Sequence, residues 1–381
     1  MLLWPISSCT VRSPRPPSLS GWRLSSHGVR EWKYDRVKWS RDLKAKLARE
    51  RILSFDKKRI REAIYRPFTK MNLYCADGVV DITGPTDEFF PEAKRQAENK
   101  AIWIKVGSEV PMFALVVNLV PNLLTQGGSQ CFPLYTYSEK DSERRDNITS
   151  KALAHFQTFY NDSEVTRTDV FNYVYALLHC PAYRSRYNEN LKRELPRIPF
   201  IGVIGDADGD APASFFPLAT CEAMRGGAKP IHNPRASANL FRAFVDAGKK
   251  LADLHVNYES AKEFPVKRQE NREVKLDWCV EAMKLVKHKG MLLYNDFLTL
   301  SGIPFEAYDY RLGNRSALEW VIDQYRVTRD ENGNIVKDPN RRDDEQYIVR
   351  LVGRVIRVSI ETMKIVNSLP VFETAQTADD E

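Results

Sequence analysis

The feature that most constrains the fold is the stretch from Asp169 to Phe200, DVFNYVYALLHCPAYRSRYNENLKRELPRIPF. It predicts two helices joined at Pro181, because proline ends one helix and is tolerated in the first turn of the next. Pro196 and Pro199 then fix the exit of the chain, and Phe200 is expected in the core. Apolar residues recur at helical steps and predict one buried face on each helix. These are Val170, Tyr173, Val174, Leu177 and Leu178, and then Tyr183, Tyr187, Leu191 and Leu195, with Arg184 and Lys192 expected to point outward.

The pattern changes along the rest of the chain. Residues 71–137 contain short β-rich runs separated by Gly and Pro, which indicate strands. Residues 150–200, a segment starting at Phe241 and the segment 344–367 have helical periodicity. Residues 203–240, rich in Gly, Ala and Pro, are predicted to form a loop-like insertion. The predicted class is α+β, a mixed sheet of short strands with several packed helices and a basic helical N-terminal arm.

Composition divides the ends of the chain from its middle. Residues 1–30 are rich in Ser, Pro and Arg, and we expect an unrelated, disordered extension there. Residues 31–75 hold fourteen basic and six acidic residues, a local net charge of +8 in a chain of net charge +7. They predict a basic helical linker whose second short helix ends before Pro67. Residues 76–370 are expected to form the main domain, and 371–381 an acidic, disordered tail.

The sequence offers little support for chemistry of its own. It has no GxxxxGK[ST] loop, no glycine-rich turn suited to a nucleotide cofactor and no metal-binding histidine spacing. Asp87, Glu92 and Lys94 loosely resemble a nuclease site, a pattern that often arises by chance. His179 is expected to be a packed histidine at a helix end. We therefore predict no catalytic residue, no metal site and no cofactor in this chain, which is not expected to be an enzyme by itself.

The six cysteines form no CxxC pair and indicate buried thiols in a reducing, cytoplasmic setting. No segment has the roughly 20 apolar residues that a membrane-spanning helix needs, so no membrane partner is expected.

Several segments, taken in order, resemble the C-terminal part of the type ISP restriction–modification enzymes. Besides Asp169–Phe200 they are VKWSRDLK (37–44), YRPFTK (65–70), GGSQCFPLYTY (127–137), AGKKLADLHVNYE (247–259), WVIDQYRV (320–327), KDPNR (337–341) and ETMKIVNSLP (361–370). Members of that family join a nuclease, an ATPase, an adenine-N6 methyltransferase and a target recognition domain. The resemblance covers about residues 31–370 of this chain. It is limited to the target recognition domain, the last part of those enzymes.

The resemblance implies sequence-specific recognition of duplex DNA in a bacterial cytoplasm. S-adenosylmethionine, ATP and Mg²⁺ are implied only for the full-length enzymes. The chain is expected to be detached or truncated from its catalytic parts, with a methyltransferase or helicase polypeptide encoded upstream as a partner. Two alternatives stay open: an adenine-specific DNA methyltransferase or endonuclease component, and a non-functional remnant.

Candidate DNA-contacting residues are chosen by side-chain chemistry, because the resemblance supplies none for base reading. Lysine and arginine suit phosphates, while arginine, glutamine and asparagine in loops suit guanine and adenine edges. The candidates are Lys57, Lys58, Arg59, Arg61, Arg66, Lys70, Gln126, Gln130, Arg184, Arg326, Arg329, Asn340 and Arg341.

Overall fold

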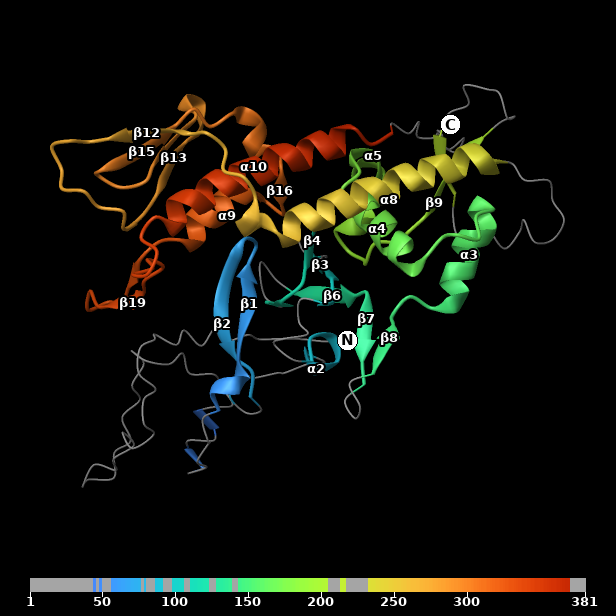
Figure 1. The fold of residues 1–381 in the computed structure, drawn as a ribbon, viewed down its shortest axis with the longest axis horizontal. Coiled ribbons are helices and arrows are strands. Elements are labelled where there is room, and N and C mark those ends of the chain that lie inside the picture. Colours follow the sequence, from blue (N-terminus) through green and yellow to red (C-terminus); the bar gives the residue numbers. More distant parts are fainter. Residues whose placement is uncertain are drawn as a thin grey trace.

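The computed structural model describes residues 44–45, 48–49, 56–76, 79, 86–91, 98–105, 110–122, 128–138, 143–204, 213–216 and 232–370. Helices and strands alternate in a mixed α+β arrangement with several small sheets (Figure 1). The strands and helices predicted for 71–137, 150–200 and 344–367 are confirmed. Among the described residues, no helix combines the length and apolarity needed to cross a bilayer.

A small central sheet forms a wall between two cores. It consists of β4 (Phe113–Val117), β3 (Ala101–Lys105) and β6 (Ser129–Pro133), in that order, all antiparallel. Every residue of β3 and β4 is buried. Successive side chains of a strand point to opposite faces. Trp103 and Leu115 accordingly join one core while Ile104 and Val116 join the other. A sheet buried on both faces explains why these strands read as continuous apolar runs.

One core lies in the helical half of the molecule, residues 143–204 and 232–256. Its helices are α3 (Ser150–Tyr160), α4 (Arg167–Leu177), α5 (Pro181–Arg186), α6 (Asn188–Leu191) and α8 (Pro234–Val256). The strands β9 (Phe200–Ile204), β10 (Ala213–Phe216) and β11 (His232–Asn233) lie beside them. Aromatic rings fill this core, and Phe200 stacks on Phe159 at a centroid distance of 4.7 Å. Phe200 is buried as predicted.

The other core lies in the sheet half, residues 257–346, together with most of α10 (Tyr347–Asn367). Its main sheet has the order β12 (Lys267–Glu270), β15 (Leu298–Ser301), β14 (Met291–Leu293) and β13 (Lys284–Val286). The short 3₁₀ helix η5 (Lys287–Lys289) joins β13 to β14, and α9 (Ala317–Gln324) packs nearby. Further short strands occur along the chain, within and outside this half: β5 (Val120–Pro121), β7 (Tyr135–Tyr137), β8 (Arg144–Asp146), β16 (Arg311–Leu312), β17 (Arg315–Ser316), β18 (Thr328–Arg329) and β19 (Ile335–Lys337).

Helices α8 and α10 connect the two halves. They run in opposite directions along the long axis and overlap near their C-terminal ends (Figure 1). There, His255 Nε2 lies 2.8 Å from Thr362 Oγ1, and His255 Nδ1 lies 2.5 Å from the Tyr175 hydroxyl. The His255 ring stacks on Tyr310, which belongs to the other core. A buried polar network therefore lies where the helical and sheet halves meet.

The prediction of a helical linker over 31–75 is wrong for residues 60–74. They form the antiparallel hairpin β1 (Ile60–Arg66) and β2 (Thr69–Tyr74), after the 3₁₀ helix η2 (Lys57–Arg59). Pro67 and Phe68 make the two-residue turn, and Phe68 adopts a φ of +57°, rare for a residue with a side chain. Burial of the Phe68 ring edge-on against Tyr258 stabilises this conformation. Long-range packing thus overrides local helical periodicity here.

The predicted loop at 203–240 is also wrong in part. Residues 234–240 are the first two turns of α8, and residues 213–216 and 232–233 are strands. Asn233 caps α8 by accepting a hydrogen bond from Ala236 N through its side chain, and Pro234 follows at the first helical position. That Asn-Pro pair is a typical helix start. Residues 205–212 and 217–231 lie outside the described part of the chain.

Candidate nucleic-acid interface

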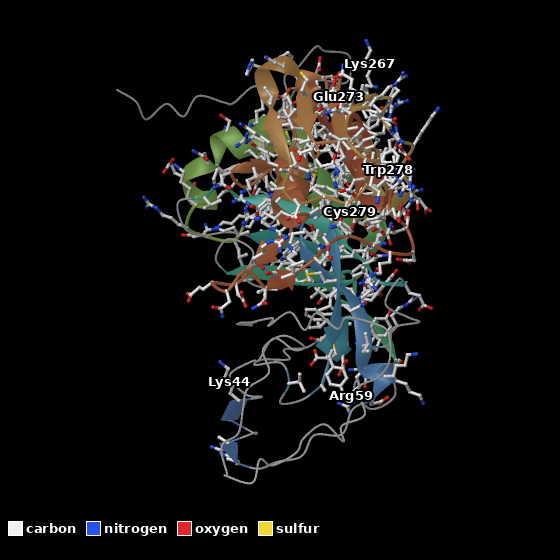
Figure 2. All side chains as sticks on the ribbon, turned by 90° about the vertical axis from the view of Figure 1, so that its left-hand side faces the viewer. Lys44, Arg59, Lys267, Glu273, Trp278 and Cys279 are labelled. Carbon is white, nitrogen blue, oxygen red and sulfur yellow. The ribbon has the colours of Figure 1, made fainter. Side chains whose placement is uncertain are left out.

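A projecting segment of the sheet half is the most exposed stretch in the described structure outside the ends. Twelve of the thirteen residues from Lys267 to Cys279 are exposed, and Trp278 alone is half-buried. The segment starts as β12, an edge strand that pairs only with β15. In Figure 2, Lys267 and Glu273 lie near the top of the view, with Trp278 and Cys279 below them. Its tip carries Arg272 and Lys275 beside Val274 and Leu276, the latter 60% exposed.

Both ends of this segment are fixed. Asn271 N donates a hydrogen bond to Phe297 O at 2.8 Å. At the other end, the Asn295 side-chain amide donates to the carbonyls of Asp277 and Cys279. Trp278 packs edge-on against Phe297 at 5.5 Å between ring centroids. The tip is therefore held in place by its ends and leaves its own side chains to solvent.

A second projecting element is the hairpin of β18 and β19. Asp330 Oδ1 accepts hydrogen bonds from Asn332 N and Asn334 N, and Gly333 takes a φ of +80° at the turn. Asp, Asn and Gly, which dominate this DENGN stretch, are typical turn residues. Arg329 Nη2 lies 2.8 Å from Glu281 Oε1, which attaches the hairpin to the segment that follows Cys279.

The sheet half also contains a groove of about 730 Å³. One wall is residues 282–288, from β13 and η5, and the other is α9 with its flanking residues. Lys284, Lys287 and His288 lie on the first wall, and Arg315 and Arg326 on the second. The wall carboxylates, Glu319 and Asp323, are already paired: Glu319 with Lys287 at 2.6 Å and Asp323 with Arg315 at 2.6 Å.

The predicted arm residues divide into two groups. Lys57, Lys58 and Arg59 are exposed on η2 and form no ion pair among the described residues. Arg61 is bound within the fold by Asp87 at 2.9 Å and by the carbonyls of Phe90 and Pro91. Figure 2 places Arg59 and Lys267 far apart, at the two ends of the view. The arm cations and the projecting segment are therefore separate surfaces.

Other candidates have contacts inside the protein. Lys70 Nζ lies 2.6 Å from Glu259, which also accepts from the Tyr347 hydroxyl. Arg66 stacks on Tyr65, and burial lowers the pKa of its guanidinium. Arg341 stacks on Tyr347, with Cζ 3.3 Å from the ring centroid. These positions give the three cations structural roles.

Asn340 is a further residue with an internal role. Its side-chain oxygen accepts from Val280 N at 2.8 Å, and its side-chain nitrogen donates to Val280 O at 2.9 Å. The amide group that would read adenine is thus occupied by backbone sixty residues away in the sequence. Gln130 is half-buried in β6, opposite Ile104. Gln126 lies outside the described residues.

The prediction that Arg184 points outward is wrong. Its Nε donates to Leu178 O at 2.6 Å, its Nη2 is buried and has no hydrogen-bond partner among the described residues, and burial lowers its pKa. Because α5 starts at Pro181 directly beyond α4, Arg184 reaches back to a carbonyl at the C-terminal end of α4, a favoured position for arginine. Arg197 remains exposed beside Glu194.

Leu195, predicted to be buried, is 39% exposed because α6 ends at Leu191 and the four-residue step no longer applies. Tyr183 and Leu191 are buried as predicted, and Tyr187 is half-buried.

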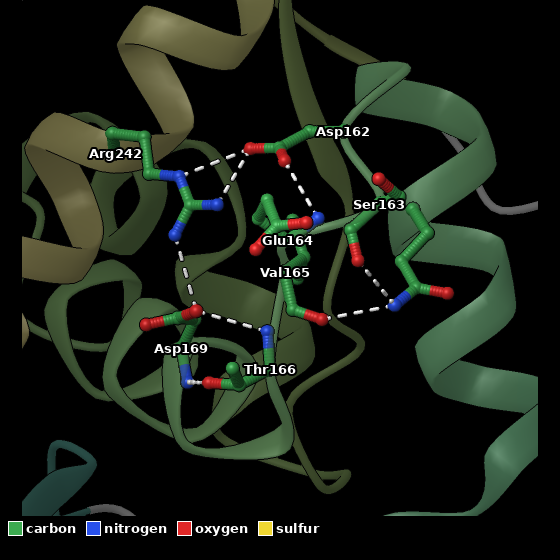
Figure 3. Close-up of polar contacts among 8 residues, drawn as sticks. Asp162, Ser163, Glu164, Val165, Thr166, Asp169 and Arg242 are labelled. Carbon is green, nitrogen blue, oxygen red and sulfur yellow. Dashed lines mark hydrogen bonds and ion pairs between the residues drawn. The ribbon is translucent and has the colours of Figure 1, made fainter.

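Arg242, in the helical half, is ion-paired with two aspartates (Figure 3). This residue of α8 lies 2.6 Å from Asp162 and 3.1 Å from Asp169. Asp169 is in addition part of the capping box of α4, in which Thr166 Oγ1 accepts from Asp169 N and Thr166 N donates to Asp169. His179, packed as predicted, lies 2.9 Å from Tyr175 O through Nδ1, and burial lowers its pKa.

The sequence prediction missed the exposed cations of the projecting segment and the groove. They are Lys267, Arg268, Arg272 and Lys275 of the segment, Lys284, Lys287 and His288 of the groove, and the adjacent Lys289. The Lys-His-Lys run before Gly290 was an available signal, since three adjacent basic residues cannot all be buried. Within the described part of the chain, no group of three or more His, Cys, Asp or Glu side chains is placed to hold a metal ion.

Comparison with known proteins gives a family and a fold. A family model described as the type ISP C-terminal specificity domain matches residues 25–351. A search of curated proteins finds no match.

Three solved structures of longer proteins are similar to the chain. A nuclease-deletion mutant of the type ISP restriction–modification enzyme LlaGI, in complex with a DNA substrate mimic, is 30% identical with a TM-score of 0.66. The DrdV–DNA complex is 30% identical with a TM-score of 0.70. The ATP-dependent type ISP enzyme LlaBIII bound to DNA is 28% identical with a TM-score of 0.68. The alignments cover 90%, 90% and 88% of this chain and 27%, 31% and 20% of those proteins.

Proposed function

Because the chain belongs to the family of type ISP C-terminal specificity domains, we propose that it recognises a short sequence in duplex DNA. The observation that carries this proposal is the alignment of 90% of the chain with a type ISP enzyme in complex with a DNA substrate mimic. Phosphate contacts from Lys and Arg would supply affinity, and side chains at base edges would supply sequence preference. Arg326, Arg329 and the arm residues Lys57, Lys58 and Arg59 remain proposed contacts.

We further propose that recognition is this chain's contribution and that methyl transfer and cleavage belong to other parts of such an enzyme. The chain spans less than a third of the similar proteins, so most of their length has no counterpart in it. In this proposal the domain starts before Ile60, because Ala63, Ile64 and Phe68 of the β1–β2 hairpin belong to the same core as the sheet half. S-adenosylmethionine, ATP and Mg²⁺ would act only with a partner polypeptide.

Selection from a random pool of duplex DNA tests the proposal directly. The full chain is incubated with the pool at low salt, bound DNA is amplified, and the cycle is repeated with rising salt. We expect enrichment of one short, asymmetric sequence, which then competes better than a scrambled duplex. Retention of DNA without any enriched sequence would contradict a specificity function, and so would failure to retain DNA at all.

A methylation assay addresses the alternative of a catalytic component. The chain is incubated with labelled S-adenosylmethionine and the enriched duplex, and no label is expected in the DNA. Transfer of label would show that the chain itself is a methyltransferase.

A further inference from the structure

We infer that the groove between β13–η5 and α9 is the site that binds the phosphate backbone of duplex DNA, with Lys284, His288 and Arg326 as its contacting side chains. This inference rests on the proposed function and adds a location to it. It also separates the groove from the arm cations, which lie elsewhere on the molecule.

The side chains that line the groove carry a net positive charge. Four Lys/Arg side chains and two carboxylates line the groove, with His288 in addition. Both carboxylates have partners within the protein. Glu319 bonds Ser316 N and Oγ at the start of α9 and pairs with Lys287, while Asp323 pairs with Arg315 and accepts from the Gln324 amide. The net charge that an incoming polyanion meets is therefore positive.

Some cations of the groove are available to bind a ligand because they have few partners within the protein. Lys284 and His288 are exposed and form no ion pair among the described residues. Arg326 has only a long contact, with Nη2 3.8 Å from Asp323, and its side chain is 54% exposed. Lys289 adds a further exposed cation at the end of η5. Lys284 and His288 can bind phosphate without breaking an internal salt bridge, and Arg326 would lose only its long contact with Asp323.

Local backbone structure fixes the shape of both walls of the groove. β13 is an edge strand, paired only with β14, so one side of its backbone has no strand neighbour. Gly290 ends η5 with a φ of +58°, and a Cβ there would lie 2.6 Å from the Ile303 carbonyl oxygen. The opposite wall is fixed by the capping box of α9. Both walls are thus preorganised, which lowers the entropy lost on binding.

The test compares two charge-matched double variants of the full chain. Lys284→Ala/Arg326→Ala removes two cations from the groove. Lys249→Ala/Lys250→Ala removes two exposed cations from α8 that form no ion pair in the described structure. The probe is a labelled duplex of random sequence, about 30 base pairs long, because a random probe reports mainly backbone contacts. Binding is measured by anisotropy across a series of salt concentrations, and thermal melts confirm that both variants fold.

We expect the groove variant to bind about tenfold or more weakly at low salt. The slope of log K against log salt should fall by about 2, since each lost phosphate contact reduces it by about 0.9. The α8 variant should stay within about twofold of the parent. Equal weakening by both variants would overturn the inference and show that only total charge matters, and so would an unchanged groove variant. Those outcomes leave the proposed function standing, whereas a parent chain that binds no duplex at low salt would overturn both.

Discussion

The helical half and the sheet half use the same polar residue types in opposite ways. In the helical half, Arg184 donates to a helix-end carbonyl, Arg242 is held by two aspartates, and His255 bonds two side chains of neighbouring helices. In the sheet half, the exposed segment 267–279 and the groove carry cations that face solvent. Charge at a given position therefore says little about function until its partners are known.

The difference predicts where substitutions change stability and where they change binding. Buried polar groups stabilise a fold when they are paired, and they are costly when a partner is removed. Exposed, unpaired cations contribute little to stability. Substitutions of the buried, paired groups of the helical half should therefore change unfolding, and substitutions in the groove should change binding. Four experiments test this division, in order of decreasing effect on stability.

Acidification should destabilise the junction between the halves most strongly. Burial lowers the pKa of His255 to about 3, and burial and Arg184 lower that of His179. An unfolded histidine titrates near 6.5, so the unfolded chain binds more protons below that pH. The free energy of unfolding should fall from pH 6.5 toward pH 3, by up to about 1.4 kcal/mol per pH unit for a single fully shifted group.

Urea unfolding at several pH values between 7 and 5 measures this loss before most carboxylates titrate. His255→Gln should flatten the pH dependence, while His288→Gln, on the exposed η5, should leave it unchanged. The same slope in His255→Gln and in the parent would show that the buried network is not the titrating element.

Gly248→Ala should give the next largest effect. A Cβ at this position of α8 would lie 1.9 Å from the backbone oxygen of Asn172 on α4, and a backbone atom of a packed helix cannot easily move away. We expect a loss of about 3 kcal/mol or more in unfolding free energy, as in severe overpacking. Gly353→Ala on α10 is the control, because its nearest neighbour is the Glu263 side chain at 3.4 Å. Equal effects of the two substitutions would argue against close α4–α8 packing.

Arg184→Ala should cost about 1–3 kcal/mol, because it removes a buried donor to Leu178 O and leaves space in the core. Arg197→Ala should cause no measurable change in a thermal melt, since its side chain is 90% exposed. The pair separates two arginines of one short stretch that the sequence alone does not distinguish. An Arg184→Ala variant that is as stable as the parent but binds DNA more weakly would show that Arg184 belongs to the DNA interface.

The groove variant Lys284→Ala/Arg326→Ala should have the smallest effect on stability, within about 0.5 kcal/mol of the parent in chemical unfolding. Its effect on binding to duplex DNA is expected to be the largest of the set. A clear loss of stability would mean that the groove cations help to fold the sheet half, and would break the division between the two halves.

Strong local periodicity made α4 and α10 predictable. The apolar stripe of Val170, Tyr173, Leu177 and Leu178 predicts α4, and all four side chains are buried. Pro67 was predicted to follow the end of a short helix, but it lies in the turn between β1 and β2. Packing of Phe68 favours the hairpin, because its ring is buried against Tyr258, almost two hundred residues away.

The candidate site was less predictable than the fold, for a physical reason. Residue type suggests which atoms can contact DNA, but only tertiary structure shows which atoms are already bonded. Asn340 is occupied by the backbone of Val280, and Lys70 by Glu259. The cations of η5 were visible as a Lys-His-Lys run, yet only the fold places Lys287 and His288 on a groove that Arg326 also lines.

The fixed ends and free tip of the projecting segment have a consequence for evolution. Substitutions among residues 272–276 would meet no packed neighbour, because the bonds that position the segment belong to Asn271, Phe297, Asn295 and Trp278. Such a tip can drift, lengthen or change charge while the sheet beneath it stays intact. Lineages could therefore explore new surface chemistry at this one place, with natural selection acting on the contact made and not on the ability to fold.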